Sequence, residues 1–292
     1  MTMPKPGWLR AAPFIFVCLW SGGFTAVRLS LDYMEPLTLQ VLRYGIIVVV
    51  LAPLALALRL PWPSWAALKP LVVMGLLVQS LYFACCNLAQ GHGVTAAGLA
   101  LVIALNPILV ALLAPWLAGE AVGPRRWLGL LLGLAGCGTV ILAGAAVRVA
   151  GYAGLGFALL ALAGMTGGTL YEKRHGRPCH PVTANLVQFV VGLACTLPLA
   201  LASETMRVDW NWGLAGPMAY LVLSNSLLAT SLLLAMIRHG EAARVASLFF
   251  LVPPLAALIA WVGLGEAMPP IAWAGTALAA GGVALANARR RG

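Results

Sequence analysis

A stretch of thirty residues occurs twice in this chain, and this duplication constrains the fold more than any other feature. Residues 107–136 read PILVALLAPWLAGEAVGPRRWLGLLLGLAG, and residues 253–282 read PPLAALIAWVGLGEAMPPIAWAGTALAAGG. Without a gap, 13 of the 30 positions are identical. The matches include Gly-Glu-Ala, Trp and Pro, which an apolar background does not produce in register. The chain is therefore a duplication with a period of about 145 residues.

The composition is that of an integral membrane protein. Of the 292 residues, 62% are hydrophobic and only 9% are charged, whereas soluble domains carry roughly 25% charged residues. No room is left for a separate nucleotide-binding domain. The net charge of +10 lies in short loops and at the carboxyl end, which indicates membrane orientation rather than nucleic-acid binding. The expected macromolecular environment is the lipid bilayer, and a monomer is compatible with the sequence.

The hydrophobic runs predict an all-α membrane protein with ten transmembrane helices. A membrane-spanning helix needs about 20 mostly apolar residues. We place the helices over residues 10–30, 36–58, 66–89, 94–117, 124–144, 151–172, 181–202, 212–237, 242–264 and 270–288. The first run resembles a signal peptide, but we expect an uncleaved helix because the repeat includes it.

The basic residues predict the orientation of these helices. With the amino terminus in the cytoplasm, fourteen of the eighteen Lys and Arg residues fall in cytoplasmic segments. Only Arg28, Arg148 and Arg207 fall in outer segments, and Arg43 lies inside a helix. This asymmetry fits the positive-inside rule with both termini in the cytoplasm.

The repeat extends to the early helices, because Ser21-Gly22-Gly23 matches Thr166-Gly167-Gly168 at a shift of 145. Helices 1–5 within residues 1–146 therefore correspond to helices 6–10 within residues 147–292. Five is an odd number, so the second half enters the membrane from the opposite side. Such an inverted 5+5 repeat is typical of secondary transporters.

Ionisable residues restrict the chemistry. All eight Asp and Glu residues map to loops or helix ends, so we infer a facilitator, or coupling through the substrate, rather than classical proton antiport. A membrane-embedded enzyme needs clustered His, Asp or Glu at membrane depth, and we expect none. His175, Cys179 and His180 lack a fourth ligand, and nucleotide-binding motifs are absent. We therefore expect no metal and no cofactor.

Arg43 is the one charge predicted inside a helix, about two turns from the outer end of the second span. One interpretation is a contact for a substrate carboxylate or a gating ion pair. The alternative is that its long side chain extends outward to Asp32 or Glu35.

Polar residues predict a central cavity. Gln79 and Tyr82 share a face of the third helix at positions i and i+3, and Asn225 and Ser226 occupy the matching stretch of the eighth. The alternative is interhelical hydrogen bonding, which contributes about 1 kcal/mol in membranes.

Three further residues are candidates for the same cavity. Trp20 and Ser21 stand beside two glycines in the first helix, where the indole could stack on a flat substrate. Phe249 lies near the middle of the ninth helix. The alternative for the small residues is close helix packing.

Glutamate and proline mark helix ends and bends. Glu120 and Glu266 precede the fifth and tenth helices, where we expect each carboxylate to stabilise the following helix dipole. Asn106-Pro107 and Pro253-Pro254 should bend the fourth and ninth helices.

The duplicated pattern resembles the EamA family of the drug/metabolite transporter superfamily. The pattern is Pro107, then Gly119-Glu120, then Trp127-x-Gly129 and a closing Gly136, with its second copy from Pro253. Trp20-Ser-Gly-Gly-Phe-Thr-Ala and the pair Pro36 and Arg43 fit the opening of that family. Within the superfamily the chain is most similar to YddG-type exporters of aromatic amino acids.

The resemblance implies a secondary exporter or facilitator in a bacterial inner membrane, with a central cavity between two inverted repeats. Its substrates would be aromatic and other neutral amino acids. The alternatives are an exporter of a drug or another metabolite within the superfamily, or a channel, for which no charged ring is present.

Overall fold

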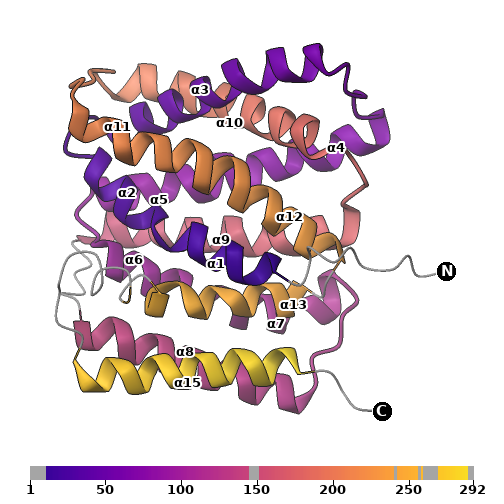
Figure 1. Ribbon diagram of the computed structural model, residues 1–292, viewed down its shortest axis with the longest axis vertical. Coiled ribbons are helices and arrows are strands. Elements are labelled where there is room, and N and C mark those ends of the chain that lie inside the picture. Colours follow the sequence, from indigo (N-terminus) through magenta and orange to yellow (C-terminus); the bar gives the residue numbers. More distant parts are fainter. Residues whose placement is uncertain (1–10, 145–150, 240–241, 256–257, 259–268, 289–292) are drawn as a thin grey trace.

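The structure, a computed structural model, consists of helices packed side by side (Figure 1). In the described part of the chain, the only extended pairing is an isolated antiparallel bridge between Met34 and Val208. The predicted all-α membrane class is confirmed. The structure describes residues 11–144, 151–239, 242–255, 258 and 269–288.

The helices follow the predicted spans, and several spans contain more than one helical segment. Those before residue 145 are α1 (Ala12–Ser21), α2 (Gly23–Ser30), α3 (Pro36–Ala57), α4 (Trp65–Met74), η2 (Gly75–Ala84), α5 (Cys85–Gly91), α6 (Ala96–Ile103), α7 (Asn106–Leu117) and α8 (Pro124–Gly144). Those after residue 150 are α9 (Gly151–His175), α10 (Pro181–Ser203), α11 (Trp212–Ala219), η3 (Tyr220–Ala229), α12 (Thr230–His239), α13 (Ala242–Ala246), η4 (Ser247–Leu251) and α15 (Pro270–Asn287).

Eight helical stretches are long and apolar enough to cross a membrane, and they coincide with the first eight predicted spans to within a few residues. The ninth predicted span begins with the shorter apolar helix Ala242–Leu255, and its later part lies outside the described residues. The tenth corresponds to α15, which has 18 residues. The total of ten crossings therefore stays a prediction.

Exposed aromatic side chains mark two levels along the bundle. Figure 1 shows that α1 begins and α15 ends at the same end of the bundle, called here the terminal side. Because Trp and Tyr favour the two membrane–water interfaces, their distribution fits a bilayer lying between these levels. Exposed Trp and Tyr residues include Trp62, Trp65 and Trp116, near the ends of α3, α4 and α7 that lie on the terminal side, and Tyr152, Trp210, Trp212 and Trp273, near the starts of α9, α11 and α15 on the opposite side.

Prolines set the ends of several helices. The fourth span is interrupted because α6 ends at Ile103 and α7 begins at Asn106, with Pro107 in its first turn. Proline lacks an N–H group, so it fits the first turn of a helix without the loss of a hydrogen bond. The predicted bend at Asn106-Pro107 is thus confirmed. The helices α3, α8, α10 and α15 each begin with proline.

The helices α8 and α15 lie side by side at the lower edge of the molecule in Figure 1. Their backbones touch at glycines. A Cβ atom added to Gly129 would lie 2.7 Å from Gly282 O, and one added to Gly282 would lie 2.7 Å from Gly129 O. Gly136 and Gly275 make the same reciprocal contact, at 2.6 and 2.9 Å. Only residues without a side chain permit this approach.

Two π-helical segments, η2 and η3, interrupt the third and eighth spans. They run over Gly75–Ala84 and Tyr220–Ala229, so they occupy equivalent positions 145 residues apart. The sequence analysis predicted uninterrupted helices here. Segments of π-helix are rare and occur frequently at functional sites. The four polar candidates Gln79, Tyr82, Asn225 and Ser226 all lie on them.

Glutamates join the two halves at both ends of the bundle. Glu204 accepts hydrogen bonds from Leu37 N (2.8 Å) and Thr38 N (2.6 Å) at the start of α3. On the terminal side, Glu120 accepts from Ala242 N at 2.7 Å and lies 3.2 Å from Lys173 Nζ. We expected Glu120 to stabilise the helix that follows it, α8. Its carboxylate instead accepts a hydrogen bond from the first residue of α13, 122 residues later in the chain. Glu266 lies outside the described residues.

Candidate functional site

Arg43 is buried in the centre of the bundle and is held by the other half of the chain. Its side chain extends from α3, and the residue is 1% exposed. Its Nε donates to Ser226 Oγ at 2.6 Å, and its Nη2 donates to Asn225 Oδ1 at 2.7 Å. The guanidinium carbon lies 4.7 Å from the centroid of the Phe83 ring, a cation–π contact. Arg43 therefore links α3 to η2 and η3.

Among the described residues, no carboxylate pairs with Arg43. Asp32 pairs with Arg28 at 2.6 Å, and Glu35 accepts from Thr205 N at 2.7 Å. The alternative that Arg43 extends outward to one of these acids is therefore wrong. A buried cation surrounded only by neutral groups is costly. This arrangement marks the position as one that an anionic group would stabilise.

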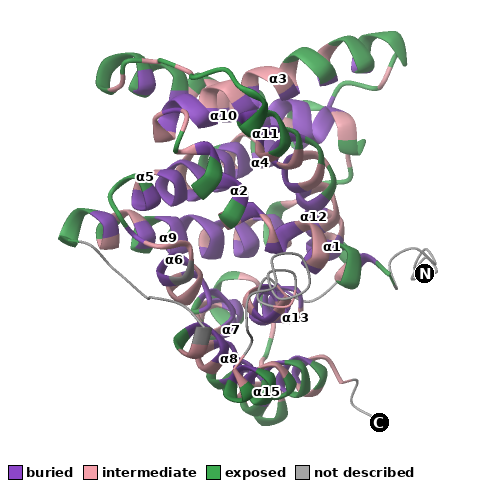
Figure 2. Ribbon diagram, turned by 60° about the vertical axis from the view of Figure 1, so that its left-hand side comes forward, coloured by how far each residue is buried: buried purple, intermediate pink, exposed green. Residues whose placement is uncertain are grey.

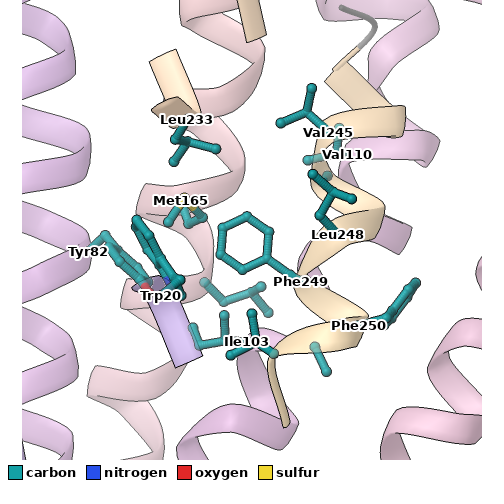
Figure 3. Close-up of a cluster of buried hydrophobic side chains, with 14 of the residues drawn as sticks. Trp20, Tyr82, Ile103, Val110, Met165, Leu233, Val245, Leu248, Phe249 and Phe250 are labelled. Carbon is teal, nitrogen blue, oxygen red and sulfur yellow. The ribbon is translucent and has the colours of Figure 1, made fainter. Parts of the chain in front are cut away.

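Aromatic rings from three spans form a cluster that includes Phe83, the ring beside Arg43. The Trp20 indole stacks on Tyr82, with centroids 6.4 Å apart and planes at 24°. The centroid of the Trp20 ring lies 5.8 Å from that of Phe83, and Phe249 packs edge-on against Trp20 with the centroids 5.5 Å apart. Figure 3 shows Trp20, Tyr82 and Phe249 directed toward one another. The rings provide flat apolar surface beside the buried charge.

A chain of buried polar side chains joins α3 to the third span. Asn87 Nδ2 donates to Gln40 Oε1 at 2.8 Å, and Gln40 Nε2 donates to Tyr44 Oη. Tyr44 Oη in turn lies 2.9 Å from Gln79 Oε1. The predicted alternative of interhelical hydrogen bonding therefore applies to Gln79, which fixes η2 against α3.

A small cavity lies where these groups meet. Its volume is about 20 Å³, which is enough for about one water molecule and too small for an amino acid. Side chains, among them aromatic rings, occupy the space around this cavity, so this structure leaves no room in it for a substrate. The cavity is lined by Trp20, Gly23, Phe24, Val27, Arg43, Tyr82, Phe83, Cys86, Asn87, Gln90 and Asn225.

The EamA-like transporter family matches this chain twice, over residues 11–142 and 152–288. The chain belongs to the EamA-like transporter family. The predicted family membership is confirmed, and this EamA-like chain is a multi-pass membrane transporter.

Relatives of this EamA-like transporter cover nearly its full length. A "Probable terminal-alkyne amino-acid exporter" of Streptantibioticus cattleyicolor is 30% identical, over 100% of this chain and 96% of that protein. The "Uncharacterized transporter sll0355" of Synechocystis is 28% identical, over 98% of this chain and 91% of that protein. One crystal structure, 23% identical and covering 97% of both chains, aligns with a TM-score of 0.73, which shows the fold.

Four of the eight predicted site residues of this EamA-like transporter line the cavity: Trp20, Arg43, Tyr82 and Asn225. Ser226 contacts Arg43 without lining the cavity, and Phe249 packs against Trp20. Gln79 belongs to the polar chain. Ser21 donates to Val17 O within its own helix at 2.6 Å and is not brought to the cavity. Their role in substrate binding stays a prediction.

Three aromatic or polar residues that line the cavity were not predicted from the sequence: Phe83, Asn87 and Gln90. They follow Tyr82 along the same span, in η2 and α5. Asn87 and Gln90 are separated by three positions in a helix of otherwise small or apolar residues. That spacing places them on one face, and it was the signal available in the sequence.

One carboxylate lies deeper than predicted. The helix α9 continues to His175, so Glu172 falls inside its last turn rather than at its end. The Glu172 side chain is fully buried, and its Oε1 accepts from Arg238 Nε at 2.5 Å. Glu172 does not line the cavity, and none of the residues that line it is Asp or Glu. In the described ranges no three His, Cys, Asp or Glu residues form a group that could hold a metal.

Proposed function

We propose that this chain is a secondary exporter or facilitator of aromatic and other neutral amino acids. The observation that carries the proposal is the buried Arg43 guanidinium, which has no acidic partner among the described residues, lies over the Phe83 ring and shares a cavity with Trp20. Arginine binds carboxylates through charge-assisted hydrogen bonds. A carboxylate joined to a flat apolar side chain would satisfy the charge and the rings together.

The relatives support an amino-acid substrate. The terminal-alkyne amino-acid exporter shares 30% identity over the whole chain, and its named cargo also combines an amino-acid group with an apolar side chain. Aromatic side chains fit the ring-lined cavity of this chain better than charged side chains. The same chemistry leaves room for other neutral amino acids.

We propose that transport uses alternating access between inverted repeats, residues 1–146 and 147–292. Three observations support it. The family matches the chain twice, the π-helical segments lie 145 residues apart, and the glycine contacts between α8 and α15 are reciprocal. Exchanging Gly129 with Gly275 and Gly136 with Gly282 turns one contact pair into the other, as a twofold axis between the helices requires.

The proposed site lies between the repeats. Trp20 and Arg43 belong to the first repeat and Asn225 to the second, so the hydrogen bonds of Arg43 cross the repeat boundary. Shifts of the third, fourth, eighth and ninth spans would enlarge the cavity and open it to either side of the membrane. The cavity of about 20 Å³ favours this mechanism over a continuous channel.

We propose that the protein lies in a bacterial inner membrane, as the resemblance to bacterial exporters implies, with both termini in the cytoplasm, as the distribution of basic residues indicates. We further propose that the substrate gradient suffices to drive transport. The support is the lack of a carboxylate among the residues that line the cavity, since proton-coupled transporters carry ionisable groups in their pathways.

Uptake of labelled phenylalanine into proteoliposomes that contain only this protein tests the proposal. We expect uptake that follows the phenylalanine gradient and is unchanged by an imposed pH gradient. Empty liposomes are the control. Folded protein that moves no phenylalanine or tryptophan would overturn the amino-acid assignment, and acceleration by the pH gradient would overturn the proposed coupling.

Replacing Tyr82 by alanine should lower phenylalanine uptake by about tenfold or more, because the ring stacks on Trp20 and lines the cavity and a buried aromatic ring contributes substantially to packing. The matched control is Tyr152→Ala, since Tyr152 is 97% exposed on the opposite side. Uptake is measured per folded transporter. Normal uptake by Tyr82→Ala removes this residue from the site.

Gly23→Ala should also lower uptake, by about tenfold. A Cβ atom at Gly23 would lie 2.7 Å from Asn225 Nδ2, so the amide must shift away from Arg43. Gly167→Ala is the control, because a Cβ there meets only the Leu77 methyl groups at 3.9 Å. Equal uptake by the two variants would show that the position of Asn225 does not matter.

A further inference from the structure

The cavity beside Arg43 contains polar atoms that no hydrogen bond uses. Asn87 Oδ1 and both side-chain polar atoms of Gln90 are buried and have no hydrogen-bond partner among the described residues. The two residues are 1% and 6% exposed, and both line the cavity. Buried polar groups are normally hydrogen-bonded, and leaving one unpaired is costly. Two such residues in one small cavity indicate that a polar group of a ligand meets them.

The orientation of the Asn87 amide is fixed by its own partners. Its Nδ2 donates to Gln40 Oε1 at 2.8 Å and to Pro36 O at 3.2 Å. Both amide hydrogens are therefore used, and Oδ1 is left as an acceptor. Gln90 lies three residues further along α5, on the same helix face, and supplies a second acceptor.

We propose that Asn87 and Gln90 bind the α-ammonium group of the transported amino acid while Arg43 binds its carboxylate. This inference rests on the proposed function. An ammonium group has three donors and no acceptor, so amide oxygens match it. The two charged groups of an amino acid are attached to one carbon, which requires their receptors to line one small cavity, as these three residues do.

Neutral receptors for the ammonium group follow from the charge of Arg43. A carboxylate at position 87 or 90 would pair with the guanidinium in the empty transporter and compete with the substrate carboxylate. Amide oxygens accept from the ammonium without forming that ion pair. Arg43 Nη1 makes no hydrogen bond with any described residue, whereas Nε and Nη2 are used. One donor group of Arg43 is therefore left for the substrate.

The proposal predicts selection for the zwitterion. We expect phenylalanine to compete for labelled phenylalanine uptake at concentrations about tenfold lower than 3-phenylpropanoate, which lacks the ammonium group, or phenethylamine, which lacks the carboxylate. These analogues keep the aromatic ring. Removing one recognised polar group leaves the buried receptor unpaired, which is why such sites discriminate well.

The decisive experiment compares Gln90→Leu and Gln188→Leu in proteoliposomes with these three competitors. Gln188 is a matched control because its side-chain polar atoms are also buried without a partner, and it does not line the cavity. We expect Gln90→Leu to weaken competition by phenylalanine about tenfold and to leave competition by 3-phenylpropanoate unchanged. The preference for phenylalanine is then lost. We expect Gln188→Leu to retain the preference.

The outcomes separate this inference from the proposed function. One outcome is that wild type moves phenylalanine while Gln90→Leu weakens competition by phenylalanine and by 3-phenylpropanoate by the same factor. In that case Gln90 has a structural role and the inference is wrong. Equal competition by phenylalanine and 3-phenylpropanoate in wild type overturns it as well. A wild type that moves no amino acid overturns the proposed function and this inference together. If Gln90→Leu fails to fold, Gln90→Met provides the same test, with Gln188→Met as its control.

Discussion

Replacing Arg43 by methionine is expected to lower phenylalanine uptake by about a hundredfold or more. Methionine fills a similar volume but removes the positive charge and both hydrogen bonds, to Asn225 and Ser226. A charge-assisted contact with a carboxylate contributes roughly 1.5–3 kcal/mol, and leaving a buried carboxylate without a partner adds a further cost. The measurement is the initial rate of labelled phenylalanine uptake per folded transporter.

The same substitution should leave the free energy of unfolding unchanged or raise it. Burying a cation that has no acidic partner among the described residues is costly to the empty protein, and the removal of this cost should offset the loss of the donors to Asn225 and Ser226. Arg28→Met is the control, since the ion pair of Arg28 with Asp32 is exposed on both sides and such pairs contribute little. The uptake rate of Arg43→Lys should fall between those of wild type and Arg43→Met, because lysine keeps the charge without the planar donors.

These results separate a binding role of Arg43 from a structural one. Normal uptake by Arg43→Met would contradict the carboxylate contact. A strongly destabilised Arg43→Met would show instead that the arginine holds α3 against η3. Loss of uptake at unchanged thermal stability is the combination that a binding role of Arg43 predicts.

Replacing Gly282 by valine is expected to separate α8 from α15 and to destabilise the protein by about 3 kcal/mol or more. The contact partners are backbone atoms, since a Cβ at Gly282 would lie 2.7 Å from Gly129 O and 2.8 Å from the Cα atom of Gly133. Backbone atoms of a packed helix cannot move aside as a flexible side chain can. The helices must therefore part, which removes their packing contacts along the whole interface.

The adjacent residue provides the control for this prediction. A Cβ atom at Gly281 meets nothing within 4 Å, and Figure 2 shows exposed residues along the outer face of α15. Gly281→Val should therefore behave like wild type. The measurement is thermal unfolding of the two purified variants in detergent. Equal unfolding temperatures would mean that the glycine contact between α8 and α15 does not hold the bundle together.

The candidate site could be predicted only in part. Trp20, Arg43 and Tyr82 were found because aromatic and charged residues stand out in apolar helices, and they do line the cavity. Ser21 was selected for the same reason but bonds to its own helix. Its hydroxyl has a carbonyl one turn away, and no sequence pattern shows whether a serine uses that carbonyl or a distant partner.

The sequence by itself determined which segments are apolar enough to cross a membrane and that the chain is duplicated. The ability to cross depends on apolarity summed over about 20 neighbouring residues, which is a local property, and the eight candidate spans of the structure lie where it predicts. The tertiary structure decided that Arg43 meets Asn225 and Ser226, 182 and 183 residues away, and that Asn87 and Gln90 join them around the cavity. Those contacts depend on how distant helices pack and on two π-helical segments that shift the register of their side chains, and neither is encoded in a local stretch of sequence.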